Sequence, residues 1–327
     1  MAEMKAQRDA YGEVLVELGE KYENFFVLDA DLTKSTKTAN FQKAFPERHI
    51  NCGIAEGNMM TVAAGIASCG NVVFASTFAM FAAGRAYEQI RNSIAYPKNN
   101  VKVVATHAGL TVGEDGATHQ CLEDIALMRA VPGMIVLAPS DAVQTKAACR
   151  FAAEYDGPVY IRLGRLPIPV VYKEEDYKFI LGKSERLADG NDVTLMFCGP
   201  FYELACDVKA ILEKNDITAR IVDMPSIKPL DVVAVRDAIE DTGLIVTIED
   251  HNVYGGLGSA VSDTLAELSI RRNRGKEVIK IGAQDKFGTS GTPAEILKAY
   301  GFDAVEIAKK IVKEKCPEFT KELKLEL

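Results

Sequence analysis

Short apolar runs alternate along the chain with longer segments whose apolar residues recur every three or four positions. Phe-Phe-Val-Leu-Asp at 25–29 and Val-Lys-Val-Val-Ala-Thr-His at 101–107 are typical of the runs, and they predict buried strands. The strands expected in the first half cover residues 25–29, 71–75, 101–107, 134–138 and 158–163, and the helices cover residues 6–22, 56–69, 78–94 and 141–154, with one more from about Leu122. Continuous apolar strands separated by helices indicate a parallel sheet covered on both faces.

The same alternation returns after a break. Segment 163–179 contains Pro167, Pro169 and a charged run, which predict a linker. Beyond it, strands are expected at residues 193–198, 217–223, 244–249 and 277–282, and helices at residues 201–214, 231–241, 256–269, 293–300 and 303–315. We therefore predict an α/β protein of two doubly wound domains, each with a mostly parallel sheet between helices. The first domain covers residues 1–170, the linker 171–190 and the second domain 191–327.

The composition narrows the class of protein. Of the 327 residues, 48% are hydrophobic and 26% charged, and the net charge is −8, so no basic surface for nucleic acid is expected. The apolar stretch from Met59 to Gly84 is interrupted by Gly70-Asn71, which favours a helix, a strand and the start of another helix over a membrane span. The seven cysteines form no C-x-x-C pair and the N-terminus has no apolar signal core, so we expect a reduced, cytoplasmic protein.

One loop concentrates residues that can carry out chemistry. The segment Gly-Glu-Asp-Gly-Ala-Thr-His-Gln at 113–120 follows the strand that ends at His107, and ligands of doubly wound sheets collect at such carboxyl ends. Glu114 and Asp115 can accept hydrogen bonds from hydroxyl groups, while His107 and His119 can exchange protons near neutral pH. On composition alone, an ordinary strand–helix loop with solvated carboxylates explains the segment equally well.

Glu56 and two phenylalanines are further candidates. Glu56 opens an apolar helix, where a carboxylate commonly just complements the helix dipole. It would also be partly desolvated there, and could then bind a ring nitrogen strongly. Phe78 and Phe81 lie three residues apart, which usually marks a core but can also provide a platform for a flat heterocycle.

Three arginines and one serine could bind a phosphate group. Arg8, Arg162 and Arg165 have the geometry for it, and Ser35 could donate to the same anion, although a lone arginine is usually solvated. Segment 249–260, Glu-Asp-His-Asn-Val-Tyr-Gly-Gly-Leu-Gly-Ser-Ala, combines acids, a histidine and glycines. Its glycines are better explained by entry into a helix, so we assign no metal ligands.

Five of these segments stand together in the order found in the transketolases. Residues 29–36, DADLTKST, resemble the ADLT-x-S segment of that family, and GIAEGNMM resembles the segment with its invariant glutamate. STFAMF is similar to the aromatic segment, ATHAGLTVGEDGATHQ to the ATH…GEDGPTHQ run, and DKFGTSGTPAEILKAYGF to the DRFG-x-SG run. The resemblance covers nearly the whole chain, but only the second half of a full-length transketolase.

The resemblance implies thiamine diphosphate chemistry and roles for the matched residues. Glu56 matches the glutamate that hydrogen-bonds the aminopyrimidine ring and so promotes deprotonation of the cofactor's reactive carbon. Glu56, His107 and His119 are the implied catalytic residues. For the cofactor, the resemblance implies that Phe81 stacks on the pyrimidine with Phe78 beside it, and that Asp31 lies in the cofactor pocket. For the substrate, it implies that His107, His119 and Asp115 contact the oxygens. The substrate's phosphate would be bound by Arg8, Ser35 and either Arg162 or Arg165. Gly57, Gly84 and Ala117 replace a histidine, a tyrosine and a proline of many members, which leaves the pocket lining open.

One motif of this cofactor class is absent from the chain, the G-D-G followed at a distance by asparagine that holds the metal and the diphosphate. We therefore expect the second subunit of a split transketolase, which transfers a two-carbon ketol unit from a ketose phosphate to an aldose phosphate in the pentose phosphate pathway. An N-terminal subunit would bind the diphosphate with Mg²⁺ or Ca²⁺, the active site would form between chains of an α2β2 assembly, and residues 59–84 would lie in or beside the interface.

Three alternatives stay open at this point. The beta subunit of a 2-oxo acid dehydrogenase has the same length and domain order, but the loop at 113–120 favours a transketolase. A 1-deoxyxylulose-5-phosphate synthase-like enzyme is normally a single longer chain. A non-catalytic binding subunit is the alternative from a different class, and the joint presence of Glu56, His107, Asp115 and His119 argues against it.

Overall fold

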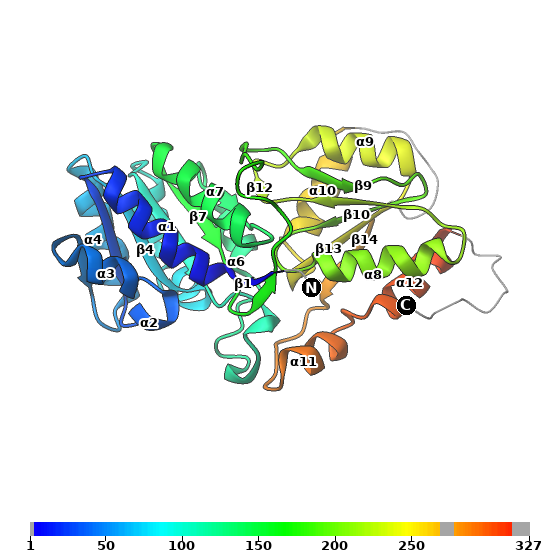
Figure 1. Cartoon of the computed structure of the whole chain (residues 1–327), viewed down its shortest axis with the longest axis horizontal. Helices are drawn as coiled ribbons and strands as arrows, with labels where there is room; N and C mark the ends of the chain where they lie inside the picture. Colours follow the sequence, from blue (N-terminus) through cyan, green and yellow to red (C-terminus); the bar gives the residue numbers. More distant parts are fainter. Residues whose placement is uncertain (1–2, 269–277, 316–327) are drawn as a thin grey trace.

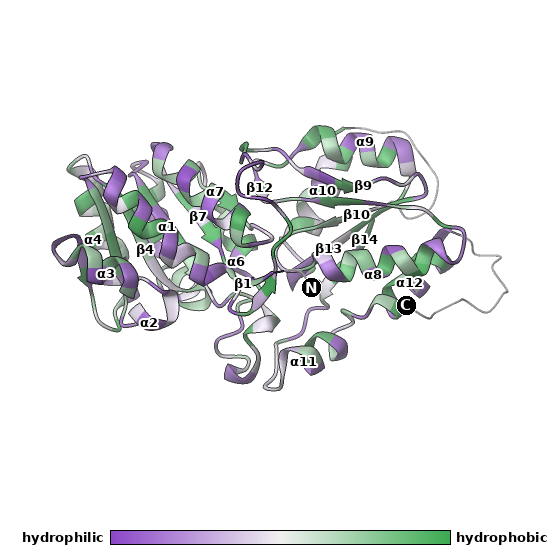
Figure 2. Ribbon diagram, viewed as in Figure 1, coloured by the Kyte–Doolittle hydropathy of each residue, from purple (hydrophilic) through white to green (hydrophobic). Residues whose placement is uncertain are grey.

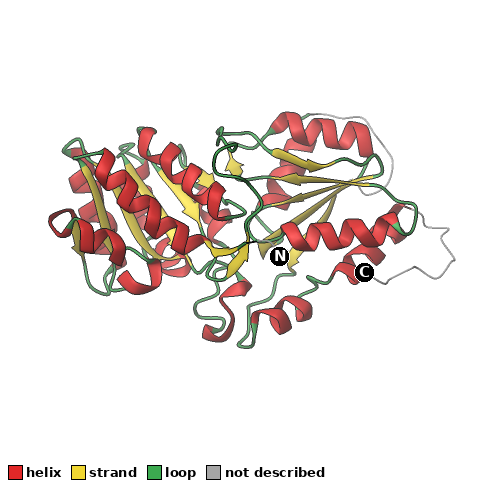
Figure 3. Cartoon of the chain, in the orientation of Figure 1, coloured by secondary structure: helices red, strands yellow, loops and turns green. Residues whose placement is uncertain are grey.

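The structure is a computed structural model that describes residues 3–268 and 278–315. Residue 269 of one expected helix, residue 277 of an expected strand, and Cys316 lie outside these ranges. Two helix-covered sheets lie side by side, one built from the first half of the chain and one mostly from the second (Figure 1). In both, the strands lie between layers of helices (Figure 3), which confirms the predicted α/β architecture with mostly parallel sheets.

The first sheet has seven strands in the order β12-β6-β7-β5-β4-β2-β3. Six of them pair in parallel, and β12 joins β6 in antiparallel orientation. The strands are β2 (Phe25–Asp29), β3 (His49–Asn51), β4 (Val72–Phe78), β5 (Val101–Thr106), β6 (Ile135–Leu137), β7 (Val159–Arg162) and β12 (Ser226–Lys228). The sequence did not predict β3 or β12, because three-residue edge strands have too short a pattern to detect.

Alternate residues of the central strands face different helices. In β4, Phe74 belongs to the same buried cluster as residues of α1 (Gln7–Lys21) and α7 (Ala142–Glu154), whereas Val73 and Ala75 belong to the cluster that includes α4 (Glu56–Ser68) and α6 (Asp124–Ala130). Apolar residues accordingly lie along the strands while the outer surfaces of the helices are more polar (Figure 2). This two-sided burial explains why the strand sequences are continuous apolar runs.

The segment expected to be a single helix at residues 78–94 is more complex. Strand β4 continues to Phe78, and the chain then forms a π-helix at Met80–Arg85, a short α5 at Tyr87–Gln89 and a second π-helix at Ile90–Ala95. Phe78 is therefore the end of a strand, which corrects the prediction that it begins a helix. π-Helical turns are frequent at functional sites, where an extra residue changes the direction of neighbouring side chains.

The second sheet has five strands in the order β14-β13-β10-β11-β9, with only the edge strand β9 antiparallel among the residues that the structure describes. The strands are β9 (Glu185–Ala188), β10 (Val193–Phe197), β11 (Ala219–Asp223), β13 (Ile245–Asn252) and β14 (Val278–Ala283). Helices α8 (Tyr202–Glu213) and α12 (Ala304–Lys315) pack on one face, and α9 (Val232–Thr242) and α10 (Leu257–Glu267) on the other (Figure 1). A short helix, α11 (Pro293–Ala299), follows β14.

The two halves share structure in several places. Strand β12 leaves the second half to pair with β6 of the first sheet. The short strand β8 (Pro167–Pro169), which lies in the proline-containing segment 163–179 just before the predicted linker, pairs in antiparallel orientation with β1 (Met4–Ala6). Strand β9 lies within the expected linker. The remaining helices of the first half are α2 (Thr33–Thr36) and α3 (Ala39–Ala44), with 3₁₀ turns at Pro46–Arg48 and Leu110–Asp115. The domain boundaries at 170 and 191 remain a prediction.

No helix within residues 3–268 and 278–315 is long and apolar enough to cross a membrane. The apolar stretch from Met59 to Gly84 instead forms most of α4, the strand β4 and part of the first π-helix.

Candidate active site

The candidate residues gather at the carboxyl ends of β2, β4 and β5. Phe78 is the last residue of β4. His107 directly follows β5, the strand that pairs with β4 in the sheet. His107 adopts a φ of 57°, a conformation uncommon for non-glycine residues, and this turns the chain sharply away from the strand. Ligands of doubly wound sheets bind at such an edge.

Four rings form a compact aromatic cluster at this edge. The rings of Phe78 and His107 stack with centroids 3.9 Å apart, and Phe81 lies 5.8 Å from Phe78 at an angle of only 19°. His119 approaches both phenylalanines edge-on, at 6.2 Å from Phe78 and 5.4 Å from Phe81. The structure thus brings together four candidate residues, of which Phe78 and His119 are 41 positions apart in the sequence.

Each histidine of the cluster has a hydroxyl partner that the sequence analysis missed. The hydroxyl of Thr106 lies 3.0 Å from Nδ1 of His107, and that of Thr118 lies 2.9 Å from Nδ1 of His119. A threonine directly before each histidine was the available signal. Because these contacts occupy Nδ1, they leave Nε2 as the ring nitrogen of His119 that can meet a ligand.

Glu56 lies buried at the start of α4 and pairs with an arginine that was not predicted. Nη1 of Arg85 donates to Oε2 of Glu56 at 2.8 Å, and the guanidinium carbon lies 4.5 Å from the centre of the Phe81 ring. The side chain of Glu56 is 1% exposed and that of Arg85 is 51% exposed. Arg85 therefore lies between the buried carboxylate and the Phe81 ring, and a flat heterocycle that takes its place can stack on that ring and hydrogen-bond the carboxylate.

A cationic group lies on the other side of His107. Nη1 of Arg8 is 3.4 Å from Nε2 of His107 and donates to the backbone carbonyl of Ser35 at 3.3 Å. Nε of Arg8 is buried without a hydrogen-bond partner among the described residues, which leaves a donor available to an anion. Burial, with a smaller contribution from the charges of Arg8 and Arg165, lowers the pKa of His107 to about 3. His107 is therefore neutral near pH 7.

The structure separates the two arginines that the sequence could not distinguish. Arg162 is buried, pairs with Asp124 at 2.9 Å, and donates to the backbone carbonyl of Asp250 at 2.5 Å. Arg165 is partly exposed, and its Nη1 lies 3.7 Å from Glu114 and 3.8 Å from Asp115. Of the two, it is Arg165 that adjoins the loop at 113–120 and the cluster around His107.

Asp31 lies on the turn after β2, and Ser35 lies in the short helix α2 that follows. Asp31 is exposed, adopts a φ of 60°, and its backbone N–H donates to the side chain of Asn51 at 3.1 Å. The preceding Asp29, which sequence reasoning did not select, is buried and accepts from His49 at 2.8 Å, and also from Thr33 and Thr38. Burial alone would raise the pKa of Asp29, but these three hydrogen bonds outweigh it and lower that pKa.

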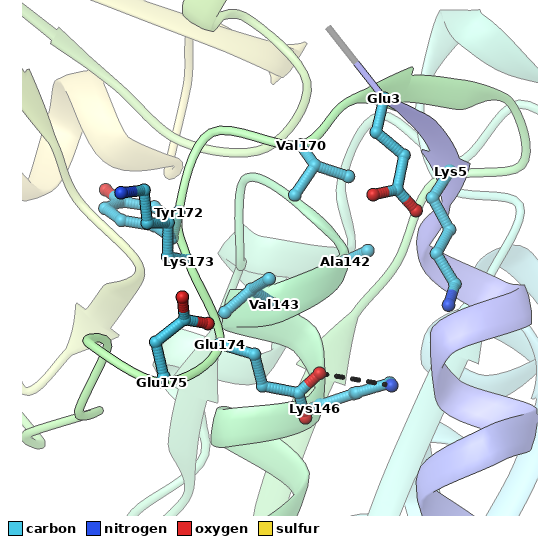
Figure 4. A pocket seen from close by; sticks show the side chains of 10 residues that line it. All are labelled: Glu3, Lys5, Ala142, Val143, Lys146, Val170, Tyr172, Lys173, Glu174 and Glu175. Atoms are coloured by element: carbon cyan, nitrogen blue, oxygen red, sulfur yellow. Dashed lines mark ion pairs between the residues drawn. The ribbon is translucent and has the colours of Figure 1, made fainter.

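Two cavities differ in their relation to this site. One of about 510 Å³ opens beside the loop, between Thr118 and Gln120 on one side and Asp285 and Phe287 on the other. The second, of about 320 Å³, is shown in Figure 4 and is lined by no residue of the aromatic cluster. It has both acidic and basic side chains, and Lys146 lies 3.5 Å from Glu174 across it, so its charge is mixed.

The residues of the site are suited to bind a planar ring and the oxygen atoms of a polar ligand. Among the residues that the structure describes, no three His, Cys, Asp or Glu side chains are placed to hold a metal ion. The site can bind a planar ring at Phe81 and Glu56, and polar groups at His107 and His119. Arg8 and Arg165 supply positive charge around the histidines.

Comparison with known proteins reveals similarity along almost the entire chain. Residues 3–169 match the family model "Transketolase, pyrimidine binding domain", and residues 182–307 match "Transketolase, C-terminal domain". The chain is 38% identical over 306 residues to one subunit of the apulose-4-phosphate transketolase of Phocaeicola vulgatus, covering 94% of this chain and 96% of that subunit. It is 36% identical over 311 residues to human transketolase, covering 94% of this chain but 48% of the human protein.

A solved structure described as "Split gene transketolase, inactive beta4 tetramer" is similar over the same extent. It superposes with a TM-score of 0.84 at 48% identity, covering 94% of this chain and 97% of that one. The match therefore extends through both sheets. This chain belongs to the transketolase family and corresponds to its pyrimidine-binding and C-terminal domains.

Proposed function

We propose that this chain is the C-terminal subunit of a thiamine-diphosphate-dependent transketolase. It would transfer a two-carbon ketol unit from a ketose phosphate to an aldose phosphate together with an N-terminal subunit. The observation that carries the proposal is the buried Glu56, linked through Arg85 to the ring of Phe81, with His119 and then Phe78 and His107 packed around that ring. The similarity to separately encoded transketolase subunits supports the same conclusion.

The residues present fit the pyrimidine half of the cofactor. Phe81 offers a partly exposed ring, and Glu56 offers a carboxylate whose burial strengthens a hydrogen bond to a ring nitrogen. Phe78 would support Phe81 from the side, and Asp31 would border the pocket from the end of β2. When bound, the cofactor supplies the carbanion that takes up and releases the ketol unit. Glu56 would hold the proton on its aminopyrimidine side.

The substrate would occupy the space around the two histidines. The pKa of His107, lowered to about 3, makes this residue a neutral hydrogen-bonding group for a substrate oxygen. Nε2 of His119 would contact a second oxygen, and Asp115 the hydroxyl next to the acceptor carbonyl. His119 and Asp115 stand on one loop, so their spacing is governed by that loop.

Phosphate binding would involve Arg8, Ser35 and Arg165. The buried, unpartnered Nε of Arg8 supports this assignment, since charge-assisted hydrogen bonds to phosphate are strong. Of the two arginines that the sequence left open, Arg165 is favoured because it is partly exposed beside the loop, whereas Arg162 is buried against Asp124. The diphosphate and its Mg²⁺ or Ca²⁺ would be bound mainly by the partner chain in an α2β2 assembly.

Reconstitution tests the proposal directly. The purified chain should show no ketol transfer alone, and should gain it with the N-terminal subunit, thiamine diphosphate and Mg²⁺. Activity is measured with a panel of ketose and aldose phosphates, because relatives carry names that refer to apulose 4-phosphate and to a sulfo sugar. Robust turnover by the isolated chain would exclude a divided active site, and inactivity of the assembled pair with every sugar would exclude ketol transfer.

A further inference from the structure

The loop that carries Asp115 and His119 is held by a carboxylate of the other sheet. Asp250 lies in β13, is 1% exposed, and faces the point where the chain leaves β5. Its Oδ1 accepts from the backbone N–H of Leu110 at 2.6 Å, and its Oδ2 accepts from the N–H and the hydroxyl of Thr111 at 3.1 and 2.7 Å. Three donors of one short segment thus converge on one carboxylate.

The backbone at Gly109 is packed tightly against the carboxyl group of Asp250. Gly109 has a φ of 81°, and a Cβ at that position would overlap the carboxyl group of Asp250. The backbone therefore passes directly against the carboxylate, which only glycine permits. Asp250 in effect caps the first turn of the 3₁₀ segment Leu110–Asp115.

The far end of the loop is held by the second half of the chain as well. Nε2 of Gln120 donates to the carbonyl of Gly113 at 3.1 Å and to the carbonyl of Thr289 at 3.0 Å. A Cβ at Gly116, between the two ends, would overlap the hydroxyl of Ser290. The loop is therefore in contact with the second half of the chain at its beginning, its middle and its end.

The electrostatic surroundings of Asp250 combine burial with several opposing interactions. Burial raises its pKa, while Arg162 and the hydrogen bonds from Thr111 and Leu110 oppose that rise. Arg162 also donates to the backbone carbonyl of Asp250 at 2.5 Å, which ties the end of β7 to β13. The pKa of Asp250 is raised overall, and the loop donors that the carboxylate holds in place favour its charged form.

We propose that Asp250 is a positioning residue for the reaction: it sets the place of the loop that presents Asp115 and His119 to the substrate. The C-terminal half thereby takes part in substrate binding indirectly, through the loop, although the four rings of the aromatic cluster all come from the first half. This inference rests on the proposed function for its kinetic consequence, but the anchoring itself does not depend on that function.

A neighbouring residue offers a matched control. Glu249 lies beside Asp250 in β13, is equally buried, and also accepts from two backbone N–H groups, those of Leu257 at 2.6 Å and Gly258 at 2.8 Å. These amides belong to α10 and not to the loop. Loss of either carboxylate disturbs a buried capping interaction, but only loss of Asp250 should disturb the loop.

The experiment compares Asp250→Asn, Thr111→Val and Glu249→Gln. Amide hydrogen exchange in the chain alone should accelerate about tenfold to a hundredfold at 110–120 in Asp250→Asn, because a charge-assisted buried hydrogen bond is lost. Thr111→Val, which removes a single donor and keeps the carboxylate, should show a smaller acceleration at the same amides. Glu249→Gln should accelerate exchange around 257–258 and leave 110–120 unchanged.

In the assembled enzyme, Asp250→Asn should raise KM for the sugar substrates about tenfold or more, while KM for thiamine diphosphate stays within about twofold. The control variant Glu249→Gln should leave KM for the sugar substrates unchanged. Unchanged exchange at 110–120 in both Asp250→Asn and Thr111→Val would overturn the anchoring. An equal rise of the sugar KM in Glu249→Gln would overturn the positioning role. If the wild-type assembly transfers no ketol unit, the proposed function fails, and the exchange measurement still decides the anchoring.

Discussion

Nη1 of Arg85 donates to Oε2 of Glu56 at 2.8 Å, while its guanidinium carbon lies 4.5 Å from the centre of the Phe81 ring. Glu56 and Phe81 are the two groups to which we assign the aminopyrimidine ring. In the single chain, Arg85 therefore occupies the face that the cofactor would use. Its half-exposed side chain can move away when the ring binds, because the ring nitrogen then replaces it as the partner of the buried Glu56 carboxylate.

Replacing Arg85 tests this competition. Arg85→Met should lower KM for thiamine diphosphate by about two- to fivefold in the assembled enzyme, because the ring no longer has to replace the Arg85 hydrogen bond, whose net contribution is about 0.5–1 kcal/mol. Arg91→Met is the matched control, since Arg91 is exposed and its guanidinium contacts Asn92 instead. A higher KM in Arg85→Met would show that Arg85 helps to bind the cofactor.

Glu56→Gln should block activation of the cofactor while leaving the fold intact. The amide cannot hold the proton that the carboxylate shares with the aminopyrimidine ring, so the expected loss is at least about 100-fold. The measurement is hydrogen–deuterium exchange at the reactive carbon of thiamine diphosphate in the assembled enzyme. Glu88→Gln, on the short helix α5, is the control. Exchange at the wild-type rate in Glu56→Gln would remove Glu56 from the mechanism.

Arg8→Ala should weaken the binding of phosphorylated sugars selectively. Removal of a charge-assisted hydrogen bond of about 1.5–3 kcal/mol should raise KM for a phosphorylated acceptor about tenfold to a hundredfold. The KM for the matching unphosphorylated acceptor should change much less. Arg236→Ala provides the control, because Arg236 lies on α9 and pairs with its neighbour Asp237 at 3.0 Å. Equal effects of Arg8→Ala on both acceptors would exclude Arg8 from phosphate binding.

His107 should make the folded state sensitive to acid. Its folded pKa of about 3 lies below the ordinary value near 6.5, so below pH 6.5 the unfolded chain binds a proton that the folded chain does not. The free energy of unfolding should therefore fall by about 2 kcal/mol on this account between about pH 6.5 and about pH 5. Urea unfolding of the wild type and of His107→Gln at both pH values measures the difference.

The His107→Gln variant should lose less stability than the wild type over that interval. NMR of the wild-type imidazole should show a neutral ring throughout, because the buried position and Arg8 both oppose its protonation. Identical pH dependence of the two proteins, together with a ring that titrates near its ordinary pKa, would contradict the low pKa. His107 would then be an ionisable group of the site instead of a neutral one.

Local pattern determined much of the fold. The strands β2, β5, β10 and β11 lie within the predicted runs, because burial on both faces of a parallel sheet leaves a continuous apolar signature in the sequence. The position of the loop at 113–120 after β5 followed from the same reasoning. Local pattern did not reveal the short strands such as β3, β9 and β12, the short helices α2 and α3, or the π-helices around Met80.

The candidate site could be predicted only in part. The structure brings four predicted residues into one aromatic cluster, Phe78, Phe81, His107 and His119. Separately, Arg8 donates a hydrogen bond to the carbonyl of Ser35. The sequence could not choose between Arg162 and Arg165, because the choice depends on Asp124, which pairs with the first. Arg85 was overlooked because its position is meaningful only when Glu56 and Phe81 are known to lie on either side of it.

The sequence by itself determined the alternation of strands and helices, the family motifs and the residue types available for chemistry, since these depend on neighbours a few positions apart. Tertiary structure decided which of those residues act together. Asp250 and Thr111 are 139 residues apart and meet only because β13 and the end of β5 face each other across the two halves. Hydrogen bonds over such separations depend on packing, which no local pattern records.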